Sequence, residues 1–363
     1  MELRDSNKPS IDPRRLVRDE GTHALANMLA ATGYMPQSHT LSDVALALRQ
    51  YHPILFGGPR GSGKTSLGEA LAQACNVTLF YVPGVEGLTA AEVLGSWRVR
   101  AQEQAIEQLI HSSTDPRTAC SLVWTEEFFE RGEFLDAFAY ASEAVQRNEP
   151  PPVLIVDEVE KLELKIQNLL LQPLARGWAN MPKLSGVIGV REREHRPIVM
   201  LTSNNLKMLS EPLRSRCFVT WMDLATPEEE IQILRARVPE AGPYLIGAAV
   251  KITQLIKWDM PQVRDKPGLR ESIDLLTALT GDGVTLLTEN VIAEYLACLG
   301  KEQKELSNLR KALARLEDAA NTEHPEIDPW VEAAFALTKQ PLNSEMRMPQ
   351  EVHASWTCDT NFP

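Results

Sequence analysis

The stretch "GGPRGSGKTSL", residues 57–67, constrains the fold of this chain more than any other part of the sequence. It fits the pattern GxxxxGK(S/T) from Gly58 to Thr65 and directly follows "HPILF", an apolar run that predicts a buried strand. Behind it, "TSLGEALAQA" has apolar residues at helical spacing, so the stretch joins a strand to the start of a helix. Glycines let backbone amides converge on one anion, and the helix N-terminus favours negative charge. An ordinary strand-to-helix turn is the alternative, but both flanks favour a phosphate-binding loop.

The loop predicts a nucleotide site with bound Mg²⁺, and its chemistry assigns a role to two side chains. Lys64 can reach the β and γ phosphates, while the Thr65 hydroxyl can coordinate the metal ion. ATP is the expected nucleotide, although the sequence does not distinguish it from GTP. The expected nucleotide-binding residues of the loop are Gly58, Pro59, Arg60, Gly61, Ser62, Gly63, Lys64, Thr65 and Ser66.

Composition indicates which partners and which cellular compartment suit such a site. The 363 residues carry a formal net charge of −12, which argues against a nucleic-acid partner because phosphate neutralisation needs a basic face. The cysteines are scattered without a CxxC pair, which argues for a reducing, cytoplasmic compartment; they are Cys75, Cys120, Cys217, Cys298 and Cys358. The N-terminus resembles no signal peptide, and no apolar run approaches the roughly 20 residues that span a bilayer, so membrane insertion is not expected.

Short apolar runs alternate with helical periodicity from residue 23 to about 225. The runs are "HPILF", "VTLFYV", "PVLIVD", "PIVMLTSN" and "FVTWMDL". Strands separated by helices imply an α/β fold with a mostly parallel sheet covered by helices on both faces. Residues 1–22 are polar with two prolines and predict a flexible N-terminal arm.

A second domain is expected to begin at residue 226. In "ATPEEEIQIL", Thr226 can cap a helix, Pro227 suits its first position and Glu229 completes a capping box. Residues 226–340 then read as helical throughout, with leucines from Leu299 onward in a heptad-like pattern that favours a long packed helix over a coiled coil. Residues 341–363 have no periodicity and predict an irregular tail.

Two carboxylates follow the most apolar of the predicted strands, in "PPVLIVDEVEK". Asp157 at the end of the strand is placed to hold Mg²⁺, and Glu158 is placed to polarise an attacking water. A solvated acidic turn is the common alternative, but the phosphate loop upstream favours the catalytic interpretation.

Polar residues near the ends of two further segments complete the candidate site. "RPIVMLTSNN" ends a strand with Asn204, whose amide could hold the lytic water, although asparagine is also a good turn residue. "SEPLRSRC" places Arg214 and Arg216 before the last predicted strand. Such arginines are usually solvated, yet at a subunit boundary one can reach a neighbour's γ-phosphate.

The order of these motifs resembles the AAA+ ATPases, and within them the MoxR-type branch that includes carbon monoxide dehydrogenase maturation ATPases. The segments that carry the resemblance are "GLTAAEVLGSW", "VLIVDEVEK", "IVMLTSNNLKMLSEPLRSRC" and "KPGLRESIDLL". The resemblance implies an AAA+ P-loop domain, a helical lid and a helical C-terminal extension. It makes Asn204 sensor 1, Arg216 the arginine finger, Arg214 a second candidate, and Arg270 the sensor 2 of the lid.

The resemblance also implies partners. Such proteins form hexameric rings with nucleotide at the subunit interfaces, and many remodel or mature a protein client together with a von Willebrand A domain protein. The alternatives are a nucleic-acid-directed AAA+ motor, a nucleotide switch in defence or signalling, and a module with a dead nucleotide site, which the intact motifs disfavour. An insertion within residues 101–134 could face a client through Trp124 and Phe128, together with the preceding Trp97, although core packing is the commoner role of such aromatics.

Overall fold

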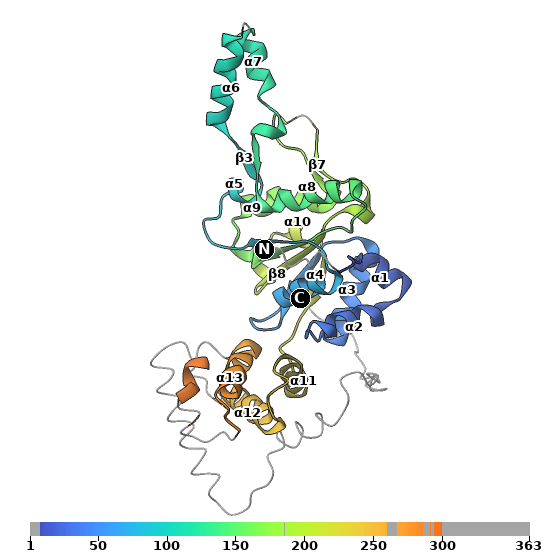
Figure 1. Cartoon of the computed structure of the whole chain (residues 1–363), viewed down its shortest axis with the longest axis vertical. Helices are drawn as coiled ribbons and strands as arrows, with labels where there is room; N and C mark the ends of the chain where they lie inside the picture. The colour runs from blue at the N-terminus through green and yellow to red at the C-terminus, as the bar shows by residue number, and fades with distance from the viewer. Residues whose placement is uncertain are drawn as a thin grey trace, which may run out of the picture.

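A parallel sheet of five strands organises the computed structural model, which describes residues 8–112, 114–184, 186–259, 267–285, 291 and 294–299 (Figure 1). The strands are β1 (Ile54–Gly57), β2 (Leu79–Pro83), β5 (Val153–Asp157), β8 (Ile198–Ser203) and β9 (Phe218–Trp221). Their order is β2-β5-β8-β1-β9, and every neighbouring pair is parallel. All five strands predicted from apolar runs are therefore confirmed, as is the parallel sheet.

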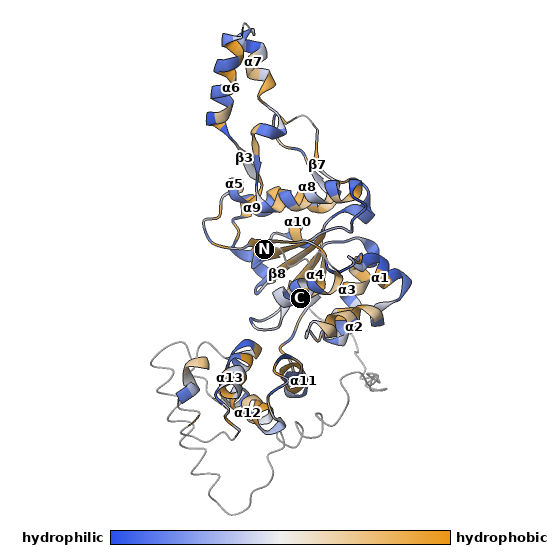
Figure 2. Cartoon of the chain, in the orientation of Figure 1, coloured by the Kyte–Doolittle hydropathy of each residue, from blue (hydrophilic) through white to orange (hydrophobic). Residues whose placement is uncertain are grey.

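Side chains alternate along each strand between two separate hydrophobic cores, one on each face of the sheet. In β5, Val153 and Ile155 belong to one core, and Leu154 and Val156 belong to the other. Because both faces of the inner strands β1, β5 and β8 are covered, these strands are apolar along most of their length, and the sheet appears in orange tones in Figure 2. Asp157 continues the alternation and so lies on the face of Ile155.

Helices cover the two faces in sequence-distinct groups. The core on the Ile155 side includes residues from α1 (Pro13–Asp19), α2 (Thr22–Ala31), α3 (Ser38–Gln50) and α4 (Lys64–Cys75). The opposite core includes residues from α5 (Ala90–Val93), α8 (Glu133–Gln146), α9 (Leu164–Arg176) and α10 (Glu211–Arg214). Short 3-10 helices follow β5 and β8, namely η2 (Val159–Lys161) and η4 (Leu206–Met208), and η3 (Arg193–His195) precedes β8.

The expected flexible arm, residues 1–22, is only partly matched by the structure. Residues 13–19 form α1, capped by the Asp12 side chain, with Leu16 and Val17 buried in the core. Arg14 is buried as well, and its guanidinium donates to the carbonyls of Arg193, Glu194, Arg196 and Pro197 at 2.6 to 3.5 Å. Burial lowers the pKa of Arg14 to about 10. The helix could not be predicted from the polar composition of this segment, because the sequence does not distinguish a buried arginine from a solvated one.

The insertion after β2 forms a helical hairpin that projects from the domain at the end far from the C-terminal helices (Figure 1). It consists of α6 (Val99–His111) and α7 (Pro116–Leu122), carried on the small sheet of β3 (Gly95–Trp97) and β4 (Phe129–Arg131) with η1 (Glu126–Phe128). Trp97 packs edge-on against Trp124 and Phe129, with ring centroids 4.8 and 5.1 Å apart. These two tryptophans therefore pack at the base of the hairpin. A second small sheet, β6 (Trp178–Ala179) with β7 (Ile188–Gly189), follows α9.

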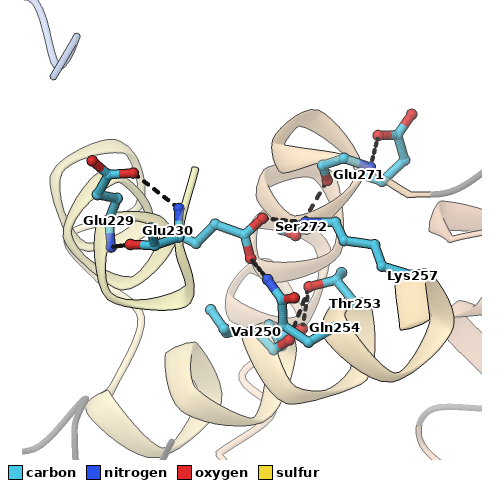
Figure 3. A network of polar contacts seen from close by, with 11 residues as sticks. Glu229, Glu230, Val250, Thr253, Gln254, Lys257, Glu271 and Ser272 are labelled. Carbon is cyan, nitrogen blue, oxygen red and sulfur yellow. Dashed lines mark hydrogen bonds and ion pairs between the residues drawn. The ribbon is translucent and has the colours of Figure 1, made fainter. Parts of the chain in front are cut away.

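The lid domain is a helical unit with its own core. It comprises α11 (Pro227–Arg237), α12 (Pro243–Asp259), α13 (Leu269–Gly281) and η5 (Leu296–Cys298). The predicted capping box at Thr226 and Glu229 is present and starts α11 at the predicted point. Glu230 of α11 forms an ion pair with Lys257 of α12 and accepts from Gln254 Nε2 at 2.9 Å (Figure 3). The predicted long leucine-patterned helix and the tail from residue 341 lie outside the described residues.

Candidate functional site

The phosphate loop runs from the end of β1 to the start of α4 in a conformation that requires glycine. Gly63 has a φ of +84° and precedes Lys64, the first residue of α4. At Gly58 a Cβ atom would lie 2.1 Å from the Met222 carbonyl oxygen, so no side chain fits there. No side chain caps the start of α4, a helix of 12 residues, so its first N–H groups have no capping partner. The loop therefore offers backbone N–H groups from which a phosphate could accept hydrogen bonds.

The Lys64 side chain extends from the first residue of α4 back to the loop. Its ammonium donates to the carbonyls of Gly58 and Pro59 at 3.0 and 2.7 Å and lies 3.4 Å from the Ser62 hydroxyl. Burial lowers the pKa of Lys64, and the carboxylates of Glu160, Asp157 and Glu158 oppose that shift. This side chain is thus the buried cation of the loop, whereas Arg60 and Ser66 are exposed beside it.

Asp157 connects the phosphate loop to the sheet through its carboxylate. Oδ1 accepts from the hydroxyls of Thr65 and Thr202, each at 2.6 Å. Thr202 Oγ1 also accepts from the Glu158 backbone N–H at 2.9 Å, so it fixes the turn that follows β5. The two predicted metal ligands, Thr65 and Asp157, are therefore brought into direct contact by α4 and β5.

Glu158 has a left-handed backbone, with φ of +47° and ψ of +48°. For a residue other than glycine this conformation costs roughly 1 to 2 kcal/mol, and such outliers gather at functional sites. Its Oε1 accepts from Asn204 Nδ2 at 2.9 Å, and its Oε2 is paired with the Lys161 ammonium. The Asn204 backbone N–H in turn donates to Glu160 Oε1 at 2.9 Å. Asn204 thus holds the carboxylate that was predicted to act on water.

A cleft of about 1030 Å³ opens beside the phosphate loop, between the α/β domain and the lid. Its walls include Gly61, Ser62, Gly63 and Ser66 of the loop region, residues 32–38 before and at the start of α3, and residues of α11 and α13. Tyr34 closes one side, with its hydroxyl donating to the Gly63 carbonyl at 3.2 Å. Burial raises the pKa of Tyr34 well above its usual range, so it stays a neutral donor. Gln37 Nε2 donates to Glu229 Oε2 at 3.3 Å and links the two domains across the cleft.

The three predicted arginines are not among the residues that line this cleft. Arg214 and Arg216 lie before β9, whose first residue pairs with Ile54, at the end of β1 away from the phosphate loop. Three residue steps of strand, roughly 10 Å, separate that end from the loop. Arg216 Nη1 donates to the Pro212 carbonyl at 2.7 Å. Arg270 is exposed near the start of α13.

The sequence assigns no role to six residues described at this site, which are Tyr34, Gln37, Tyr81, Glu160, Lys161 and Thr202. Thr202 and Glu160 neighbour predicted residues, so their polar character at a strand end was the available signal. The Tyr81 hydroxyl donates to Asp157 Oδ2 at 2.7 Å, and the sequence gives no signal of this contact because it depends on the order of strands in the sheet. The roles assigned to the predicted site residues stay predictions.

The residues present fit a nucleotide with Mg²⁺. Within the described ranges no group of three or more His, Cys, Asp or Glu side chains could hold a metal ion by itself. A metal here would therefore be held by Thr65, Asp157 and phosphate oxygens together, and Mg²⁺ favours such sparse protein ligation. None of the described helices has the length and apolar character that crossing a bilayer requires.

The match to one family model supports this interpretation of the site. Residues 53–217 match the model of the AAA domain (dynein-related subfamily). The gas vesicle ATPase GvpN1 of Halobacterium salinarum is 22% identical over 210 residues, which is 56% of each protein, so the chain spans little more than half of this curated relative. Among solved structures, a RuvB mutant from Thermotoga maritima aligns with a TM-score of 0.43 and 16% identity over 84% of this chain and 89% of that one.

The parallel sheet, the glycine-rich loop after β1 and the acidic end of β5 define a P-loop nucleotide-binding domain. Residues 53–217 match the model of an AAA domain, so this part of the chain has the fold of an AAA+ P-loop ATPase domain.

Proposed function

We propose that the chain hydrolyses ATP with Mg²⁺ and that Glu158 polarises the attacking water. The observation that carries the proposal is the placement of Glu158 by Asn204, next to the contact between Asp157 and Thr65. Bound nucleotide would supply the phosphoryl group that is transferred to water. Lys64 and the first amides of α4 would bind the phosphates, and Thr65 and Asp157 would hold the metal ion.

Substitution of Glu158 tests this proposal. In Glu158→Gln an oxygen still accepts from Asn204, but the side chain no longer takes a proton. We expect the affinity for a fluorescent ATP analogue to stay within about twofold, while turnover falls by roughly 10² to 10⁴. Glu163→Gln, at an exposed glutamate that precedes α9, is the matched control and should retain turnover. Full activity of Glu158→Gln, or loss of binding, would contradict the role.

We propose further that the protein assembles into a ring, a hexamer by the resemblance to MoxR-type proteins, in which Arg216 acts on the neighbour's nucleotide. Support comes from its position near the amino end of β9, away from the phosphate loop of its own chain. A guanidinium that acts only on developing charge changes turnover and not binding. Arg214 and Arg270 are the second candidate finger and the lid's sensor 2.

Mixing two inactive variants tests the shared site. Arg216→Ala should bind ATP and lose turnover, and Lys64→Ala should lose binding. In a mixed ring, an Arg216→Ala subunit next to a Lys64→Ala subunit has an intact phosphate loop and receives an intact arginine. Recovered turnover is the expected result. No recovery in rings that demonstrably contain both chains would refute action in trans.

The substrate we propose for the ring is a protein client, remodelled in the cytoplasm with a von Willebrand A domain partner. The resemblance to MoxR-type proteins supports this part, and the net charge of −12 disfavours nucleic acid. Glu158→Gln should retain nucleotide and hold such partners during native purification. A retained protein with a von Willebrand A domain that is absent from Lys64→Ala purifications is the expected result; equal recovery with both variants would contradict it.

A further inference from the structure

Tyr81 lies on β2, the edge strand of the sheet beside β5. It is paired in register with Ile155, so Asp157 lies two residues further along β5 on the same face. A diagonal neighbour of this kind is within reach of a long aromatic side chain. The Tyr81 hydroxyl makes use of that reach and donates to Asp157 Oδ2 at 2.7 Å.

Hydroxyls from three different elements thus hold the Asp157 carboxylate. Thr65 of α4 and Thr202 of β8 both donate to Oδ1, and Tyr81 of β2 donates to Oδ2. With two donors on Oδ1, the lone pairs of that oxygen are in use, whereas Oδ2 keeps capacity beyond its bond to Tyr81. The oxygen best able to serve a metal ion or its bound water is therefore the one that Tyr81 orients.

Tyr81 also lies at the cleft beside the phosphate loop. The residue is 39% exposed and lines this cleft, so solvent reaches it there. Asp157 is held from the main chain as well, because its carbonyl accepts from the Gly84 N–H at 2.7 Å.

We propose that Tyr81 is a positioning residue that sets the affinity of the nucleotide site for Mg²⁺ by orienting Asp157 Oδ2. The inference rests on the proposed function. Mg²⁺ demands near-ideal octahedral geometry, so a carboxylate oxygen that is less firmly oriented binds it less well, even while Thr65 and Thr202 still hold Oδ1. Loss of a hydrogen bond to a metal-binding side chain typically costs 10- to 100-fold in metal affinity.

The test is a Mg²⁺ titration of nucleotide binding rather than of turnover. Affinity for a fluorescent ATP analogue is measured against Mg²⁺ concentration for wild type, Tyr81→Phe and Tyr140→Phe. Tyr140 is the matched control because its hydroxyl contacts Thr78 and Glu149 and its ring packs on Phe80, away from Asp157. We expect Tyr81→Phe to raise the Mg²⁺ midpoint about 10-fold or more, with unchanged affinity in EDTA, and Tyr140→Phe to match wild type.

Three results would count against the inference or its basis. A Tyr81→Phe midpoint within twofold of wild type would overturn it. Equal weakening of analogue binding with and without Mg²⁺ would also overturn it, because Tyr81 would then contact the nucleotide itself. Failure of the wild-type protein to bind the analogue at any Mg²⁺ concentration would instead overturn the proposed function, and this inference with it.

Discussion

Removal of the Lys257 ammonium should destabilise the helices of the lid domain, because it leaves the buried carboxylate of Glu230 without a counter-charge. The side chains of Lys257 and Glu230 are only 8% and 2% exposed, and Gln254 is the other donor drawn to Glu230 in Figure 3. In Lys257→Met, Glu230 keeps a hydrogen bond but loses its counter-charge. Breaking a buried pair from one side costs about 3 to 5 kcal/mol, whereas replacing both partners by apolar residues is often neutral or stabilising.

Amide hydrogen exchange of α11, α12 and α13 in the full chain measures this cost as a local opening free energy. We expect Lys257→Met to lower it by about 3 kcal/mol or more, and the double variant with Glu230→Leu to recover most of the loss. Lys251→Met, at an exposed position of α12, should change it by about 1 kcal/mol or less. The reasoning would be refuted by a small effect of Lys257→Met, or by a double variant as unprotected as the single one.

Three further substitutions have expected outcomes. Thr202→Val removes the hydroxyl that donates to Asp157 and accepts from the Glu158 N–H. Turnover should fall at least about 10-fold, and the free energy of unfolding in urea should fall by about 1 to 3 kcal/mol. Unchanged turnover would contradict this. Gly84→Ala places a Cβ about 2.2 Å from the Glu158 carbonyl oxygen, so steady-state assays should show reduced turnover; turnover equal to wild type would contradict this. Arg14→Met removes the guanidinium donor from four carbonyls, of which that of Arg193 still accepts from the Arg196 N–H at 3.4 Å. The urea midpoint should fall by the equivalent of about 3 kcal/mol, and an unchanged midpoint would contradict this.

The sheet could be predicted from sequence because its inner strands β1, β5 and β8 are buried on both faces and are therefore apolar along most of their length. The start of the lid could be predicted as well, because Thr226 and Glu229 form a local capping box whose partners are three residues apart. Local patterns of this kind need no knowledge of the rest of the fold.

The remaining features depend on contacts between residues far apart in the chain. The guanidinium of Arg14 donates to carbonyls of residues some 180 positions later in the chain. The composition of residues 1–22 gives no sign of these contacts and predicts a solvated arm. Tyr81 reaches Asp157 only because β2 is the neighbour of β5 in the sheet. The sequences of these two strands do not predict that they are neighbours. The role proposed for Arg216 depends on contact with a neighbouring copy of the chain, and the sequence does not show how two copies meet.

The place of β1 in the sheet also fixes when this site can form during synthesis. Ile54 pairs with Met200 on one side and Phe218 on the other, so both neighbours of β1 come from residues 198–221. Asp157 and Asn204, the other residues of the candidate site, are also synthesised long after the phosphate loop. A nascent chain that ends before β8 therefore carries the loop on a strand without partners, and such unpaired edges favour aggregation. Nucleotide can consequently assist folding only after nearly the whole α/β domain has been made.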